Sequence, residues 1–190
     1  MTVRIVRFCS LYLLVSALVF GGSYLFEERY YFRDPYPFES PLISATTLRI
    51  REDRLGKGTF GAPRSGKRRH LGIDLLATEG EPVVAVRSGV AQVEHQEGMG
   101  TFVKIKHREG LQTIYGHLSE AYLPRIARVR QGQVIGAVGK SGNASRRAIL
   151  PHLHFEIRDG KQVLDPTPFI QEALARPRKR LDFLVSSGVR

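Results

Sequence analysis

The chain has 190 residues, of which 42% are hydrophobic and 25% charged, which fits one ordinary domain with attachments and argues against wholesale disorder. Its 29 basic and 18 acidic side chains leave a net charge of +11, which predicts an anionic partner such as nucleic acid, a membrane surface or an acidic polymer. The single cysteine, Cys9, excludes an internal disulfide framework and a cysteine-rich zinc site.

The first 26 residues are predicted to be a membrane or export segment. Residues 8–26 carry no charge, and a helix of this length, at about 1.5 Å per residue, spans a hydrocarbon core of roughly 30 Å. A retained signal anchor and a cleaved signal peptide both stay open, and the anchor is favoured because no A-x-A site is visible. Arg4 and Arg7 precede the span, so the positive-inside rule places residues 27–190 in the periplasm or cell envelope, which argues against nucleic acid as a partner.

Residues 27–45 are predicted to form a stiff, extended tether, because they contain three prolines and lack helical periodicity. The pattern then changes to short apolar or alternating runs separated by glycines, which is typical of strands. The short spacing leaves no room for crossover helices and favours antiparallel sheets. Six strands are predicted, over residues 82–86, 89–93, 101–106, 111–118, 134–138 and 153–157.

One late helix is predicted, with Thr167 as its N-cap, Pro168 in its first turn and its end near Ala175. The expected fold class is therefore mainly β, with antiparallel sheets, one short C-terminal helix and an N-terminal transmembrane or signal helix. The domain is expected to cover residues 46–172. Residues 173–190 form a basic tail that is typical of a solvated end.

Two short patterns carry candidate chemistry. In a strand, residues i, i+2 and i+4 share a face, so His152, His154 and Glu156 are expected to point the same way. Such a face fits a metal site, an acid–base pair or a solvent-facing polar stripe. In the second pattern, a turn at Gly72 would bring His70 and the carboxylate four residues later onto one ion, whereas a straight strand would hold them too far apart.

Two imidazoles and one carboxylate leave one position of a tetrahedral zinc ion open for water, which is the arrangement of a catalytic site. The chain has no H-E-x-x-H motif, in which a glutamate on a helix acts as the base, so that mechanism is excluded. His117, in the run YGHL on a neighbouring predicted strand, is a candidate for the base.

Six segments together carry a resemblance to a known family: GAPRSGKRRHLGIDL, EPVVAVRSGV, GMGTFVKIKH, LQTIYGHL, GQVIGAVGKSG and PHLHFE. In order and approximate spacing, the chain from about Phe60 to Pro166 resembles the lysostaphin-type zinc metallopeptidases, which cut peptide bonds in bacterial peptidoglycan. The resemblance implies an open β-rich core with a groove over one sheet, and one zinc ion. The residues it implies are His70, Asp74 and His154 as ligands, with His117 and His152 as the catalytic pair.

Other residues depart from this pattern or lie outside it. The loop Asn143–Leu150 is about twice as long as in many relatives, and its Arg146 and Arg147 either meet substrate carboxylates or belong to a solvated surface. His107 is interpreted as structural, and His95 has no assigned counterpart.

Two functions stay open at this point. The favoured one is a zinc endopeptidase that hydrolyses peptide cross-links or stem peptides of peptidoglycan, because all five site residues are present. The alternative is a non-catalytic, zinc-binding regulator of other cell-wall hydrolases. The expected partners are peptidoglycan and, through residues 8–26, the cytoplasmic membrane, while the sequence identifies neither a regulatory partner protein nor the bond that is cut.

Overall fold

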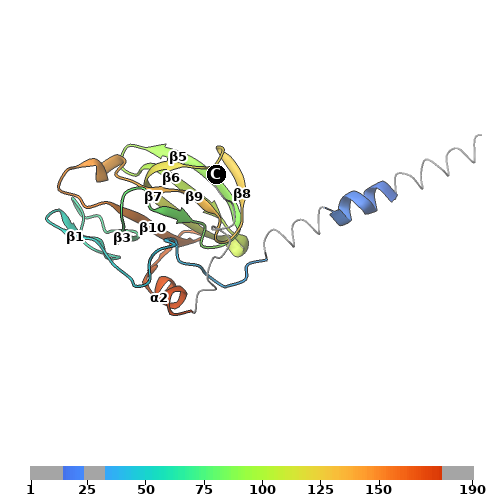
Figure 1. The fold of residues 1–190 in the computed structure, drawn as a ribbon, viewed down its shortest axis with the longest axis horizontal. Helices are drawn as coiled ribbons and strands as arrows, with labels where there is room; N and C mark the ends of the chain where they lie inside the picture. Colours follow the sequence, from blue (N-terminus) through green and yellow to red (C-terminus); the bar gives the residue numbers. More distant parts are fainter. Residues whose placement is uncertain (1–14, 24–32, 177–190) are drawn as a thin grey trace, which may run out of the picture.

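The computed structural model describes residues 15–23 and 33–176 (Figure 1). Residues 15–23 are helical, and among the described residues no helix combines the length and the apolar character needed to cross a bilayer. The predicted span at 8–26 and the predicted basic tail both lie partly outside these ranges. The anchor, its cleavage and the role of the tail therefore remain predictions.

The domain is built from antiparallel strands, as the glycine-punctuated pattern predicts. The strands are β1 (Glu52–Asp53), β2 (Gly56–Lys57), β3 (Ile73–Leu76), β4 (Pro82–Val84), β5 (Gly89–Gln96), β6 (Gly100–Lys106), β7 (Leu111–Ala121), β8 (Ile126–Val129), β9 (Val134–Val138), β10 (His152–Asp159) and β11 (Gln162–Leu164). β1 and β2 form a separate hairpin, and the large sheet runs in the order β11-β10-β7-β6-β5-β8. β3 adds to β10, and β9 pairs with β7 and β4.

All six predicted strands are present, with ends that differ by a few residues. The sequence reasoning missed β3, β8, β11 and the β1–β2 hairpin, which are only two to four residues long. Strands this short have too few residues to display a period of two. β3 matters most among them, because it carries one of the site residues alongside β10.

The core lies on the apolar face of β10 and its neighbours. Leu153, Phe155 and Ile157 are fully buried, as the alternation along β10 predicts. Tyr115 of β7 packs on Phe155 with ring centroids 5.3 Å apart. The opposite face of the same strand is thereby left to the polar residues of the site.

Residues 33–45 differ from the predicted tether because they pack into this core. Phe38 and Leu42 are 4% and 3% exposed. The Phe38 ring lies 6.2 Å from Phe155 and 5.4 Å from Phe169 of the helix, measured between centroids. The segment bends at residues 35–37 and 43–44 and is not a straight extended chain, and its apolar side chains bury hydrophobic surface against the domain.

Replacing Phe38 by alanine is expected to lower the free energy of unfolding by about 3–5 kcal/mol, because it leaves a large cavity in the core. Urea unfolding followed by circular dichroism measures this difference. Tyr122→Ala is the matched control, since Tyr122 is 54% exposed and its loss is expected to change stability by less than about 0.5 kcal/mol. Equal effects of the two substitutions would mean that residues 33–45 are a tether after all.

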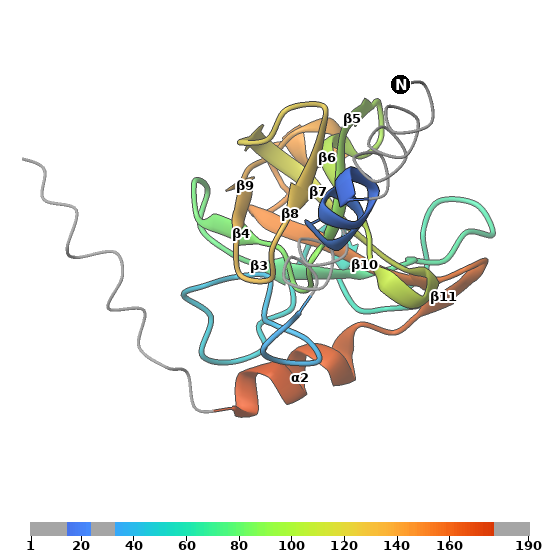
Figure 2. The same cartoon turned by 90° about the vertical axis from the view of Figure 1, so that its right-hand side faces the viewer.

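The helix α2 (Thr167–Ala175) covers the core beside the segment that contains Phe38 (Figure 2). Its start differs from the prediction: Pro166 is the N-cap and Thr167 lies inside the first turn. The Thr167 amide donates to Oδ1 of Asp165 at 2.9 Å, so an aspartate two residues upstream supplies the capping acceptor.

His107, at the end of β6, is buried and hydrogen-bonded inside the fold. Its Nδ1 donates to the Ser88 carbonyl at 3.0 Å, and its Nε2 lies 2.7 Å from the Thr113 hydroxyl. Burial, reinforced by the nearby charge of Arg87, lowers the pKa of His107 from 6.5 to about 4. The ring is therefore uncharged at neutral pH, and its role is structural, in agreement with the interpretation from the sequence.

This burial predicts how stability depends on pH. The folded-state pKa of His107 lies below its unfolded value, so its contribution is fully present above about pH 6.5 and is lost as the pH falls towards 4. Between pH 7 and pH 4, the free energy of unfolding of the wild-type protein is expected to fall by on the order of 3 kcal/mol more than that of the His107→Gln variant. Urea unfolding at each pH measures both values. The exposed His95→Gln serves as control, and identical slopes for wild type and His107→Gln would contradict the expectation.

Candidate metal centre and active site

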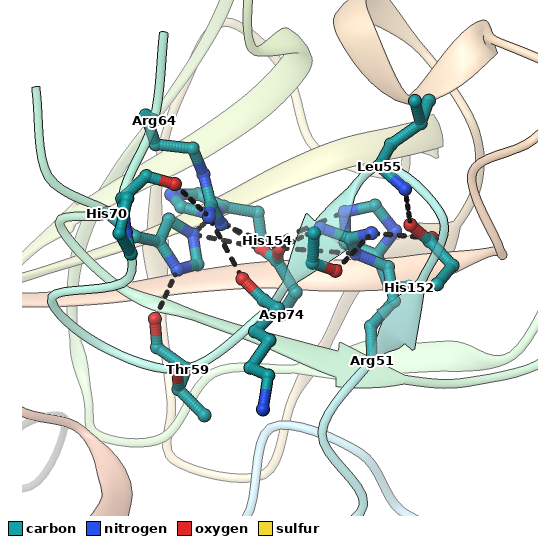
Figure 3. Close-up of polar contacts among 12 residues, drawn as sticks. Arg51, Leu55, Thr59, Arg64, His70, Asp74, His152 and His154 are labelled. Atoms are coloured by element: carbon teal, nitrogen blue, oxygen red, sulfur yellow. Dashed lines mark hydrogen bonds and ion pairs between the residues drawn. The ribbon is translucent and has the colours of Figure 1, made fainter. Parts of the chain in front are cut away.

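The candidate site forms where β3, β10 and β7 lie side by side. His154 of β10 is directly opposite Asp74 of β3 on one side and opposite Gly116 of β7 on the other. His70 lies just before β3, and the chain bends at Gly72, as the sequence predicts. Figure 3 shows His70, Asp74 and His154 converging from these separate segments.

Gly72 is required by a close approach and not by its backbone angle. A Cβ atom at this position would lie 2.2 Å from the Phe155 carbonyl oxygen and 2.9 Å from Cγ of Glu156. Only a residue without a side chain lets the bend pass this close to β10. The bend therefore depends on a contact between segments that are far apart in the sequence.

Three donor atoms converge closely enough to hold one metal ion. His70 Nε2 lies 3.0 Å from His154 Nδ1 and 3.0 Å from Asp74 Oδ1, and His154 Nδ1 lies 2.9 Å from the same oxygen. All three side chains are buried. Zinc bonds near 2 Å place tetrahedral donors roughly 3.3 Å apart, so this nitrogen and oxygen set fits zinc after a small outward adjustment.

The other ring nitrogens of the two histidines have acceptor-only partners. His70 Nδ1 donates to the Thr59 carbonyl at 2.9 Å. His154 Nε2 donates to Glu156 Oε1 at 3.0 Å, and Glu156 in turn accepts two hydrogen bonds from Arg158. These contacts leave His70 Nε2 and His154 Nδ1 as the nitrogens that face the shared centre, where a bound metal would need their lone pairs.

His117 and His152 lie beside this centre with their Nε2 atoms available. His152 Nδ1 donates to the Leu150 carbonyl at 2.7 Å, and His117 Nδ1 donates to the Ser141 carbonyl at 3.0 Å. The two rings are 5.0 Å apart between centroids, and His152 Nε2 is 3.8 Å from Asp74 Oδ1. His117 also has a φ of 62°, a left-handed conformation that is costly for a residue with a side chain.

The surroundings of these three histidines give them different protonation states. Burial, together with the neighbouring His154 and His152, lowers the pKa of His117 to about 3, and burial also lowers the pKa of His152. Burial opposes the charge of His154 as well, but hydrogen bonds to Asp74 and Glu156 raise its pKa to about 9. A metal that binds His154 must displace a proton, so metal affinity is expected to rise with pH.

Asp74 stays ionised at the centre of the site. Burial alone would raise its pKa, but the hydrogen bonds from His154 and His70 hold the pKa of the carboxyl well below its usual range. His117 and His152 are thus neutral bases next to a permanent carboxylate. The arrangement suits a metal-assisted reaction in which two imidazoles handle protons.

The structure adds site residues that the sequence reasoning did not single out. Arg51 and Arg64 both donate to Oδ2 of Asp74. Arg64 lies inside the first resembling segment, where it could have been noticed, whereas Arg51 stands 23 residues before its partner without any local pattern. Arg146 and Arg147 are exposed on the loop before β10, and their contact with substrate remains a prediction.

Comparisons with known proteins agree with this fold and site. Residues 68–166 match the model of peptidase family M23. The DD-carboxypeptidase/endopeptidase Mpg of Neisseria meningitidis serogroup B is 42% identical over 100 residues, which cover 52% of this chain and 22% of that protein. The murein hydrolase activator EnvC of Escherichia coli is 34% identical over 112 residues, covering 58% of this chain and 26% of EnvC.

A solved structure supports the same comparison. The catalytic domain of lysostaphin from Staphylococcus simulans has a TM-score of 0.53 and 28% identity, and the match covers 61% of this chain and 90% of that domain. The match to the two relatives above, by contrast, spans only about a fifth to a quarter of their length.

Proposed function

Because the chain belongs to peptidase family M23, whose members act in peptidoglycan hydrolysis or its regulation, we propose that it is a zinc-dependent endopeptidase. Its proposed substrates are peptide cross-links or stem peptides of bacterial peptidoglycan. The observation that carries the proposal is the complete set of five side chains: three donors within 3.0 Å of one another and two neutral histidines beside them.

His70, Asp74 and His154 are the proposed zinc ligands. When bound, zinc supplies Lewis-acid chemistry, since it lowers the pKa of water towards about 7 and polarises a peptide carbonyl. Asp74 contributes the single negative charge of the ligand set. The Thr59 carbonyl and Glu156 hold the two imidazoles in the orientation that this role needs.

His117 and His152 are the proposed catalytic pair. Each donates its Nδ1 hydrogen to a backbone carbonyl, so each has an Nε2 lone pair that can accept a proton from the attacking water or, once protonated, donate to the developing oxyanion. Burial lowers the pKa of both rings, which keeps them neutral before reaction. The two roles are symmetric in this geometry and are not divided between the residues.

The basic character of the chain supports an anionic cell-wall polymer as partner. The exposed Arg146 and Arg147, on the loop that leads into β10, are proposed to meet substrate carboxylates. We also propose that the domain works outside the cytoplasm, in the periplasm or cell envelope, tethered to the membrane through residues 8–26. The boundaries at residues 46 and 172 belong to the same proposal, with residues 33–45 packed onto the domain.

A regulator of other cell-wall hydrolases is the second candidate, because the relative EnvC is by name a murein hydrolase activator. The deciding experiment incubates the full-length protein with purified peptidoglycan and analyses the muropeptides by mass spectrometry. A zinc chelator is added in a parallel sample and zinc is then restored. New, chelator-sensitive products are expected, whereas unchanged muropeptides despite bound zinc would favour the regulator.

A further inference from the structure

The two oxygens of Asp74 face different partners. Oδ1 is the oxygen near the two histidine donors of the candidate metal site. Oδ2 accepts hydrogen bonds from Arg51 Nη2 at 3.0 Å and Nε at 3.3 Å, and from Arg64 Nη2 at 3.3 Å. Arg51 is only 5% exposed, so its pair with Asp74 is a buried, charge-assisted contact. The arginines therefore occupy Oδ2 and leave Oδ1 to a metal.

Backbone hydrogen bonds also hold Arg51 next to Asp74. Its amide donates to the Asp74 carbonyl at 2.8 Å, the Asp74 amide donates to the Gly58 carbonyl at 2.8 Å, and the Gly58 amide donates to the Arg51 carbonyl at 2.8 Å. A Cβ atom on Gly58 would lie 2.6 Å from Cβ of Asp74. The β1–β2 hairpin is thus held tightly against the part of β3 that carries the carboxylate.

Asp53 extends this contact to the other side of the site. Its carboxylate accepts from Arg51 Nη1, and the same oxygen accepts from the Leu150 amide at 3.2 Å. The Leu150 carbonyl in turn accepts the Nδ1 hydrogen of His152. A continuous chain of polar contacts therefore runs from Asp74 through Arg51, Asp53 and Leu150 to His152, and Figure 3 shows Arg51 between the two ends.

We propose that Arg51 and Asp53 are positioning residues for the site. Arg51 keeps Asp74 a one-oxygen ligand by holding Oδ2. Asp53 fixes the backbone at Leu150 and, through it, the ring orientation of His152. Both residues precede the 68–166 family match, and the proposal rests on the proposed zinc site.

The proposed role of Arg51 is tested by the zinc affinity of the protein, measured in competition with a chromogenic chelator. Arg51→Gln removes the charge, and Arg51→Lys keeps the charge and the apolar stem but loses the fork that fits a carboxylate. Both are expected to weaken zinc binding about 10–100-fold, as the loss of a group that orients a metal ligand does. Arg87→Gln, which breaks a partly buried pair with Asp34 elsewhere, is the matched control and is expected to leave the affinity within about twofold.

A spectroscopic measurement separates this role from a general loss of stability. In protein loaded with Co²⁺, release of Oδ2 is expected to raise the coordination number, which weakens the visible absorption bands. A merely structural Arg51 would leave the spectrum of the folded fraction unchanged. Circular dichroism of each variant gives that folded fraction. If Arg51→Gln fails to fold, the affinity and the spectrum of Arg51→Lys test the proposal in its place.

The proposed role of Asp53 is tested with the variant Asp53→Asn, which keeps the shape of the side chain but removes its charge. Its kcat on peptidoglycan fragments is expected to fall about tenfold or more with an unchanged KM, because His152 is no longer held in place. Zinc content is expected to stay stoichiometric. A proportional loss of zinc and activity, or no loss of either, would overturn the Asp53 assignment.

Failure of this inference can be told apart from failure of the proposed function. If the wild-type protein binds no zinc, the proposed function fails and the positioning role fails with it. If wild type binds zinc but both Arg51 variants match its affinity and its Co²⁺ spectrum, only the positioning role of Arg51 is overturned.

Discussion

Replacing His152 by glutamine is expected to lower the turnover of peptidoglycan by about 100-fold or more while zinc stays bound, and His117→Gln is expected to do the same. Each substitution removes a neutral Nε2 base beside the metal site without removing a proposed zinc ligand. Release of muropeptides measures the turnover, and elemental analysis of the same samples measures the zinc.

His95→Gln is the matched control for both histidine variants, because His95 is exposed on β5, outside the site. It is expected to retain full activity. If His117→Gln and His152→Gln also retained full activity, the assignment of the catalytic pair would be wrong. If they lost zinc as well, the two residues would belong among the ligands.

Replacing Asp74 by alanine is expected to abolish both stoichiometric zinc and activity, because the variant lacks the only carboxylate among the three proposed ligands. A second effect is expected in the metal-free protein. Arg51 and Arg64 lose their common acceptor, and breaking a buried ion pair on one side costs about 3–5 kcal/mol. Zinc analysis and urea unfolding without added metal measure the two effects separately.

Asp159→Ala is the control, since Asp159 lies on the same strand as His154 but is exposed. It is expected to keep zinc, activity and stability. An Asp74→Ala protein that kept both zinc and activity would refute the proposed ligand set. One that lost zinc without losing stability would instead contradict the importance of its contacts with the two arginines.

Long alternating segments of this fold are readable from local sequence. β10 alternates polar and apolar residues from His152 to Arg158, and its apolar residues are fully buried as that alternation predicts. The four-residue β3 is not readable, since it becomes a strand by pairing with β10 and not by its own pattern. The packing of the segment around Phe38 is likewise not readable, because its prolines predict an extended chain but do not predict the surface on which it packs.

The candidate site also has one part that local sequence predicts and one part that it does not. His152, His154 and Glu156 are placed on one face by the geometry of a single strand, and their burial follows from the position of β10 in the sheet. The contact between His70 and His154 joins residues 84 positions apart. No local period can report such a contact, and only the resemblance to a family indicates it in the sequence.

By itself, the sequence determined that this protein is an antiparallel β domain with histidines presented on one strand face, because strand periodicity and glycine turns act over a few residues. The tertiary structure alone decided that Arg51 and Arg64 share one oxygen of Asp74 and that Asp53 reaches the backbone before His152. The contacts of Arg51 and Asp53 exist only once the β1–β2 hairpin packs on the sheet. The pair between Arg51 and Asp74 gains its strength from burial, which no stretch of sequence displays on its own.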